Sequence, residues 1–230
     1  MKTLRLLAVP FFITLFLVFT SATDGGRETE KLHDAANVLK EFDKMKESIP
    51  HDLISEYQGI VIIPNMINAG LGIGGKRGKG VAIVKLDDGS WSDPVFVTLT
   101  GGSIGPQIGV QAVDLVMVFR HKGALTRVKN GDVTIGGDIS AAAGPVGRTT
   151  SANTDYEFKA EVYSYSRSRG LFAGISLNGT SLSIDKAANR SYYGDDMTAH
   201  DIFNDSKSTT KAVTNLKNTL AELAANKENQ

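Results

Sequence analysis

One glycine-rich stretch has the spacing of a nucleotide-phosphate site. The segment Gly70–Gly75, GLGIGG, matches G-x-G-x-x-G, and with Lys76 it also matches the start of a phosphate-binding P-loop. Both sites require a helix directly after the glycines, because its N-terminal amides and its dipole hold the phosphate. The next residues, 77–83, are broken by glycine and then β-branched, and Arg77 stands where a P-loop needs Ser or Thr. We therefore expect no nucleotide site.

Other patterns of catalysis and metal binding are equally weak. The four histidines lack the spacing of a zinc-ligand motif. The acid pairs at residues 87–88 and 195–196 lack the D-x-D-x-D-G pattern of a calcium loop. The chain has no cysteine, which excludes disulfides and thiolate metal sites. We expect a protein that is not an enzyme and that holds no cofactor and no metal.

A basic cluster indicates a different chemistry, the binding of anions. Lys76, Arg77 and Lys79 lie within a stretch whose glycines predict a hairpin tip. Such a tip is either a solvated turn or a site whose cations and backbone amides contact anionic phospholipid headgroups. Arg167 and Arg169 alternate with serines and would share one strand face. There they either extend the basic surface or pair with acidic residues.

Cations alone would not hold this protein on a membrane. Three of them supply about 3 kcal/mol at an anionic surface, whereas a millimolar affinity already needs about 4 kcal/mol. An apolar contribution is therefore required, and its nearest source is the helix that residues 27–49 predict. Leu39 and Phe42 belong to its apolar stripe, and Pro50 ends it. That stripe either packs on the sheet or inserts into a bilayer.

The middle of the chain predicts a β-rich fold. Of the 24 glycines, 21 lie between Gly59 and Gly179, where short β-branched runs alternate with turn pairs such as Asp88-Gly89 and Gly101-Gly102. This pattern favours the α+β class, with a mostly antiparallel β sandwich or partial barrel flanked by an N-terminal amphipathic helix and a C-terminal helix. Without a Pro/Ser-rich linker, we expect one domain over residues 23–205, then a C-terminal helix and polar tail over 206–230.

The first residues have the composition of a targeting segment. Lys2 and Arg5 precede an apolar run over residues 6–19 and then the small residues 20–22, which is the order of a secretory signal peptide. The run is shorter than the roughly 20 residues that span a bilayer. We expect residues 1–22 to direct export, to the periplasm or the extracellular space. The formal net charge of +0 argues against a nucleic-acid partner.

Seven segments, in order, resemble the SYLF-domain family over about residues 30–194. The matching stretches are Ala69–Gly80, Trp91–Pro94, Val97–Ser103, Gly105–Gly109, Asp114–Val116, Gly144–Gly147 and Tyr163–Gly174. The resemblance implies lipid binding and, in yeast and animal members, association with cortical actin. It also implies that the helix carrying Leu39, Lys40 and Phe42 contributes to membrane binding. The predicted export resembles that of bacterial members, for which an actin partner is less expected.

Two hypotheses follow from the sequence. In the first, the chain is a non-enzymatic module that binds an anionic phospholipid membrane. Its candidate lipid-binding residues are Lys76, Arg77, Lys79, Leu39, Lys40, Phe42, Arg167 and Arg169. In the second, it is a structural or protein-interaction domain of the cell envelope, with a protein partner.

Overall fold

The computed structural model describes residues 24–45, 49–128, 132–143, 160–172, 175–204 and 208–225. The predicted signal peptide, residues 1–22, and the end of the polar tail lie outside these ranges. None of the helices that the described residues form combines the length and apolar character needed to cross a bilayer.

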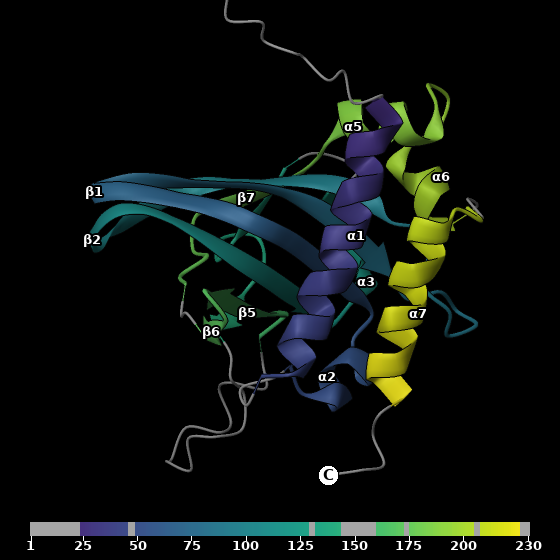
Figure 1. Cartoon of the computed structure of the whole chain (residues 1–230), viewed down its shortest axis with the longest axis horizontal. Helices are drawn as coiled ribbons and strands as arrows, with labels where there is room; N and C mark the ends of the chain where they lie inside the picture. Colours follow the sequence, from purple (N-terminus) through teal and green to yellow (C-terminus); the bar gives the residue numbers. More distant parts are fainter. Residues whose placement is uncertain are drawn as a thin grey trace, which may run out of the picture.

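The fold is organised by one long antiparallel hairpin made of β1 (Gly59–Val84) and β2 (Val95–Phe119). The two strands pair from Gly59 opposite Phe119 to Ala82 opposite Val95, with register shifts between Ile63 and Met66 and between Leu71 and Ile73. Halfway along, the two-stranded ribbon turns back on itself, as Figure 1 shows at the end where the labels β1 and β2 stand. We call this bend, residues 67–75 and 102–112, the ribbon tip.

Glycines allow the two halves of β1 to approach one another behind the bend. A Cβ on Gly80 would lie 1.9 Å from the Ile62 carbonyl oxygen, and one on Gly78 would lie 2.4 Å from an Ile63 methyl group. At this distance no side chain fits between the two backbones. Because side chains alternate along a strand, Lys79, between these two glycines, and Arg77, just before them, point to the opposite, outer face.

Shorter strands extend both halves of the ribbon into a nearly closed, mostly antiparallel sheet. β5 (Val162–Ser168) pairs with the second half of β2, and β7 (Thr180–Ile184) pairs with its first half. β3 (Val133–Ile135) and β6 (Leu171–Phe172) add antiparallel pairs to β7 and β5. β4 (Ala141–Ala143) runs parallel to β5. The predicted α+β class and its mostly antiparallel sheet are confirmed.

Helices cover both faces of the sheet. α1 (Asp24–Asp43) and α7 (Lys211–Ala225) pack against each other on one face, with α2 (His51–Glu56) beside the end of α7 (Figure 1). α3 (Lys122–Val128) lies on the other face. α5 (Lys186–Tyr193) and α6 (Ala199–Asn204) follow β7. The sheet therefore has a hydrophobic core on each side.

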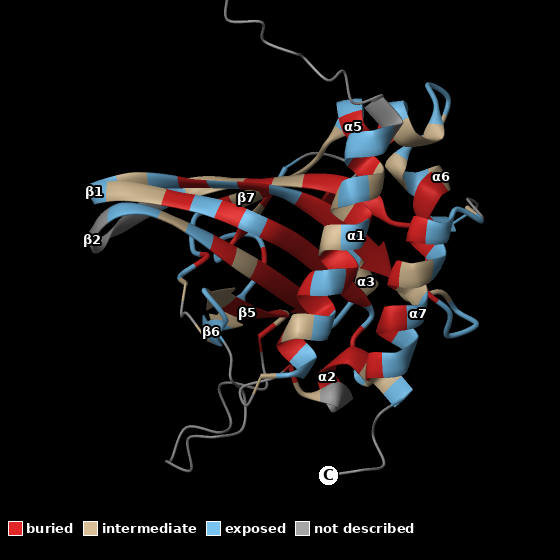
Figure 2. Cartoon of the chain, in the orientation of Figure 1, coloured by how far each residue is buried: buried red, intermediate tan, exposed pale blue. Residues whose placement is uncertain are grey.

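Strand alternation divides the apolar residues between these two cores. Ile60 and Ile62 belong to the core beneath α1, α2 and α7, whereas Val61 and Ile63 belong to the core on the α3 side. Figure 2 shows that burial is greatest where the helices cross the sheet and falls toward the ribbon tip. The tip is thus a two-stranded extension that projects past the helices.

Candidate functional site

The apolar stripe of α1 is part of the core. Leu39 is 0% exposed and Phe42 is 1% exposed, and both pack between α1 and the sheet. Of the two interpretations left open by the sequence, packing on the sheet is the correct one, and the predicted insertion of this stripe is wrong for this fold. Lys40 lies on the exposed side of the helix, away from the apolar residues that were to accompany it.

The predicted basic hairpin tip is also corrected by the structure. Lys76, Arg77 and Lys79 lie inside β1, paired with β2, so alternation sends them to different faces. Lys76 points inward, is 6% exposed and donates a hydrogen bond to the Ser176 carbonyl oxygen. Burial lowers the pKa of its ammonium group. Arg77 and Lys79 are on the outer face, so the three cations do not form one surface.

Arg167 pairs with acidic residues rather than extending a basic surface. Its guanidinium lies 2.8 Å from an Asp114 carboxylate oxygen and 3.6 Å from one of Glu41. It also lies over the Phe42 ring, 5.8 Å from the ring centre, and so ties α1 to β2 and β5. Arg169 follows the end of β5 with a φ of 51° and is exposed. The predicted common strand face of the two arginines is therefore wrong.

Lys79 forms an ion pair at the start of α5. Its ammonium lies 2.7 Å from the Asp185 carboxylate, which also caps α5 by accepting from the Ala188 amide. Burial alone would raise the pKa of the Asp185 carboxyl, but the hydrogen bonds from Lys79 and Ala188 and the charges of Lys79 and Lys31 hold it below its ordinary value of 3.8. This cation therefore contributes to holding α5 in place.

Substituting this carboxylate should change the acid stability of the protein. A carboxyl whose pKa is lower in the folded state than in the unfolded state stabilises the fold above about pH 4. This stabilisation is lost as the pH falls through the folded-state pKa. We expect Asp185→Asn, which keeps a capping oxygen, to lower the free energy of unfolding at pH 7 by less than about 1 kcal/mol. The difference should shrink below pH 4 in urea unfolding curves. Asp185→Ala should cost about 1 kcal/mol more, because it also removes the cap. A constant difference from pH 7 to pH 3 would contradict this account.

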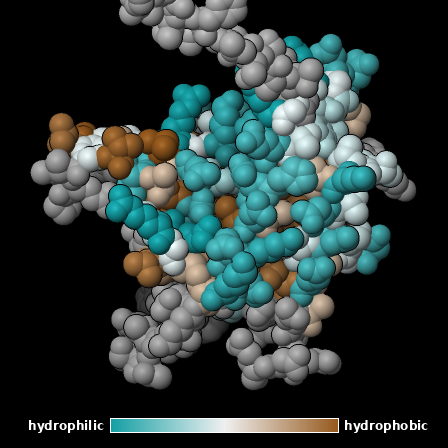
Figure 3. All heavy atoms as spheres, in the orientation of Figure 1, coloured by the Kyte–Doolittle hydropathy of each residue, from teal (hydrophilic) through white to brown (hydrophobic). Residues whose placement is uncertain are grey.

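The ribbon tip carries a group of exposed apolar side chains that sequence reasoning missed. Leu71 is 78% exposed, Ile73 is 80% exposed and Val110 is 75% exposed, with Ile67 at 45%. Four of the five large apolar side chains exposed among the described residues lie at this bend. Such a concentration is uncommon on a soluble monomer and indicates a contact surface. Figure 3 shows the hydrophobic atoms gathered at the free end of the ribbon.

Strand alternation places these side chains on one face. Ile67, Leu71 and Ile73 stand at odd positions of β1, and Val110 lies opposite Ala69 in β2. Arg77 continues the same row behind Ile73, four residues or about 13 Å along the strand. The period of two, I-x-A-x-L-x-I, was the available signal. It was hidden because the intervening glycines had predicted a turn.

A second pattern, also not recognised from the sequence, does not form a catalytic site. Residues 101–105, GGSIG, match the G-x-S-x-G motif of serine hydrolases. That motif positions its serine at a sharp turn between a strand and a helix. Here all five residues lie within β2, so the backbone context of the nucleophile is not formed.

Comparison with known proteins gives one consistent family. The family model Ysc84, described as Las17-binding protein actin regulator, matches residues 100–223. The chain is 37% identical over 176 residues to SH3 domain-containing YSC84-like protein 1 of Xenopus laevis, covering 73% of this chain and 52% of that protein. It is 35% identical over 175 residues to the human protein of the same name, at 73% and 51% coverage. It is 35% identical over 181 residues to LAS seventeen-binding protein 3 of Saccharomyces cerevisiae, at 75% and 39% coverage. The chain thus spans about half the length of the animal relatives that it matches.

Proposed function

The chain belongs to the Ysc84 (SYLF) family, whose model is described as Las17-binding protein actin regulator and whose matched relatives are not named as enzymes, and we propose that it is a non-enzymatic domain that binds anionic phospholipid membranes. The observation that carries this proposal is the exposed apolar ribbon tip with Arg77 behind it. The α1 stripe has no part in it, because that stripe is buried.

The tip has the arrangement that an interfacial anchor needs. Leu71, Ile73 and Val110 project at the free end, where they would enter the apolar side of a bilayer interface. Arg77 lies about 13 Å back along the same face, at a depth suited to lipid phosphates. The backbone of the ribbon is hydrogen-bonded between β1 and β2 on both sides of the bend. Within the ribbon tip, only the short irregular stretch between the pairs Leu71–Ile108 and Ile73–Ile104 lacks ladder partners, so a shallow insertion at the interface, where water still reaches the backbone, is the depth we expect.

The expected affinity of one tip is modest. Partial burial of three apolar side chains contributes about 4 to 5 kcal/mol, and one exposed arginine contributes about 1 kcal/mol at an anionic surface. The sum corresponds to a dissociation constant of about 0.1 mM. The apolar side chains thus contribute more binding free energy than the arginine does. The basic cluster in the sequence had indicated the opposite, with cations as the main contribution. Added salt should therefore weaken binding to anionic vesicles without abolishing it, because salt screens the charge of Arg77 but not the apolar contacts.

Vesicle co-sedimentation tests the proposal. We expect the domain to bind phosphatidylcholine vesicles that contain phosphatidylserine more tightly than pure phosphatidylcholine vesicles. Arg77→Gln should weaken binding to the anionic vesicles about fivefold, because it removes about 1 kcal/mol of attraction. Lys211→Gln, at an exposed position on α7, removes the same charge away from the tip and should have no effect. Binding to neither vesicle type would overturn the proposal, as would equal losses for the two variants.

Export sets the side of the membrane on which the domain would act. With residues 1–22 as a secretory signal, the tip would meet a membrane leaflet that faces the periplasm or the extracellular space. An actin-associated partner, which the description of the family suggests for its members, would then not be encountered. Capture of an envelope protein by crosslinking, together with failure to bind any vesicle, would instead support the protein-interaction hypothesis.

A further inference from the structure

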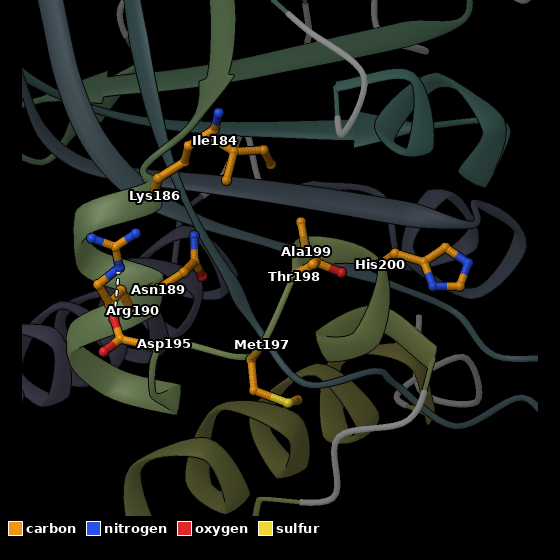
Figure 4. Close-up of a pocket in the computed structure, with 9 residues that line it drawn as sticks. All are labelled: Ile184, Lys186, Asn189, Arg190, Asp195, Met197, Thr198, Ala199 and His200. Carbon is orange, nitrogen blue, oxygen red and sulfur yellow. Dashed lines mark ion pairs between the residues drawn. The ribbon is translucent and has the colours of Figure 1, made fainter.

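A second feature lies away from the ribbon tip. A half-open pocket of about 450 Å³ is lined by the end of β7, α5, α6 and the segment between these two helices, at the opposite end of the sheet from the bend (Figure 1). Its volume falls within the range of pockets that hold small organic ligands. Figure 4 shows side chains of α5 along one side, residues of α6 along the other and Met197 between them.

The floor of this cavity is apolar. Ile184, Met197 and Ala199 line it and are each partly buried against the core on the α3 side of the sheet. Because these side chains rest on packed residues, the floor is formed before any ligand arrives. A ligand with an apolar body would displace water from them, and the flexible thioether of Met197 can adapt to its shape.

The rim of the cavity is cationic. Lys186 and Arg190 stand one helical turn apart on α5 and are exposed. Arg190 uses its Nε to pair with Asp195 at 2.8 Å, and the two terminal nitrogens of its guanidinium take no part in that bond. His200 completes the rim from α6. Two permanent cations thus line the cavity together with one carboxylate, which is already paired.

The neighbouring polar groups have structural roles and do not compete for a ligand. The Asn189 amide donates to the carbonyl oxygens of Phe96 and Asp185 and accepts from the Phe96 amide, so it fixes α5 to β2. The Asp201 carboxylate accepts from the backbone and side chain of Thr198 at the start of α6. These bonds hold both walls of the cavity in place.

We propose that this cavity binds a small organic anion. The apolar body of the ligand rests on Ile184, Met197 and Ala199, and its carboxylate or phosphate group lies between Lys186 and Arg190. The charge of the rim selects against cationic and neutral molecules of the same shape. This inference is independent of membrane binding, because it uses no residue of the ribbon tip.

Three probes of one shape test the proposal: 4-phenylbutanoate, 4-phenylbutylamine and 4-phenylbutanol. In methyl NMR spectra, 4-phenylbutanoate should shift the Met197 and Ala199 signals saturably. The amine and the alcohol should bind at least fivefold more weakly. The double variant Lys186→Gln/Arg190→Gln should weaken 4-phenylbutanoate binding at least tenfold, and Lys211→Gln should leave it unchanged.

A substitution that fills the cavity gives a second test that does not depend on charge. Met197→Trp should remove 4-phenylbutanoate binding while the rim cations remain. Its urea unfolding curve reports whether the variant folds, and if it does not, the double charge variant decides the question. Equal binding of the three probes would overturn the proposal, as would no saturable shift or full binding by a folded Met197→Trp variant.

Discussion

Replacing Leu71 and Ile73 with serine should weaken binding to phosphatidylserine-containing vesicles by about 100-fold. The two side chains are 78% and 80% exposed, so each has nearly its whole apolar surface available for insertion. The loss of about 1.5 kcal/mol per side chain amounts to about 3 kcal/mol, and each 1.4 kcal/mol is a factor of ten in affinity. Vesicle co-sedimentation over a lipid titration measures the change.

A matched control separates insertion of the tip from general surface hydrophobicity. Leu171→Ser removes an apolar side chain of β6 that is 73% exposed but lies outside the ribbon tip. This variant should bind vesicles as the unsubstituted protein does. Both sets of substitutions are at exposed positions, so the free energy of unfolding should change by less than about 0.5 kcal/mol. Equal losses from the two variants would show that the tip has no special role, and so would an unaffected double variant.

Lys217→Met should lower the free energy of unfolding by about 3 kcal/mol. Asp93, in the connection between β1 and β2, is 0% exposed. One of its carboxylate oxygens accepts from the Lys217 ammonium of α7 and the other from the Ser208 amide. Methionine keeps most of the apolar stem of lysine but leaves the buried carboxylate without its cation, which is the costly way to break a buried ion pair. Urea unfolding followed by circular dichroism measures the loss.

The partner residue shows whether this loss comes from charge. Adding Asp93→Asn to Lys217→Met removes the buried negative charge that has lost its lysine, so the double variant should be destabilised by less than the sum of the two single substitutions. Lys211→Met, on the exposed first turn of α7, should change the free energy of unfolding by less than about 0.5 kcal/mol. Additive effects of the two single substitutions would rule out the ion pair as the cause.

Much of the architecture could be predicted from local patterns. The three- and four-residue apolar spacing identified α1 and α7, since a helix that packs on one side must repeat this way. The turn at Asp88-Gly89 was also correct, with Gly89 at a φ of 82°. The prediction of turns at Gly78, Gly80, Gly101 and Gly102 is wrong, because these glycines lie within β1 and β2. Gly78 and Gly80 are required where the other half of β1 approaches closely, and Gly101 is required where Thr180 of β7 does. A contact between residues this far apart in the sequence leaves no local signal.

The candidate site was harder to predict for a related reason. A stripe such as Leu39 and Phe42 has the same spacing whether it faces a sheet or a bilayer, so only the fold could decide between the two. The charges of Lys79 and Arg167 are matched by Asp185 and Asp114, which are 106 and 53 residues away in the sequence. Such pairing depends on tertiary structure. The exposed tip could have been found, because Leu71 and Ile73 already stood at alternate positions in front of Arg77.

The long pairing of β1 with β2, which shifts register only between Ile63 and Met66 and between Leu71 and Ile73, affects how the chain reaches its native state. Pairing can begin beside the connection at residues 85–94, where Ala82 meets Val95, and each further pair then closes a loop only slightly larger than the last. Pairing can extend in this way through the bend to Gly59 and Phe119, so no single step has to close a large loop at a high cost in chain entropy. The two strands that flank β2 in the sheet, β5 and β7, would then pair with a hairpin that is already formed.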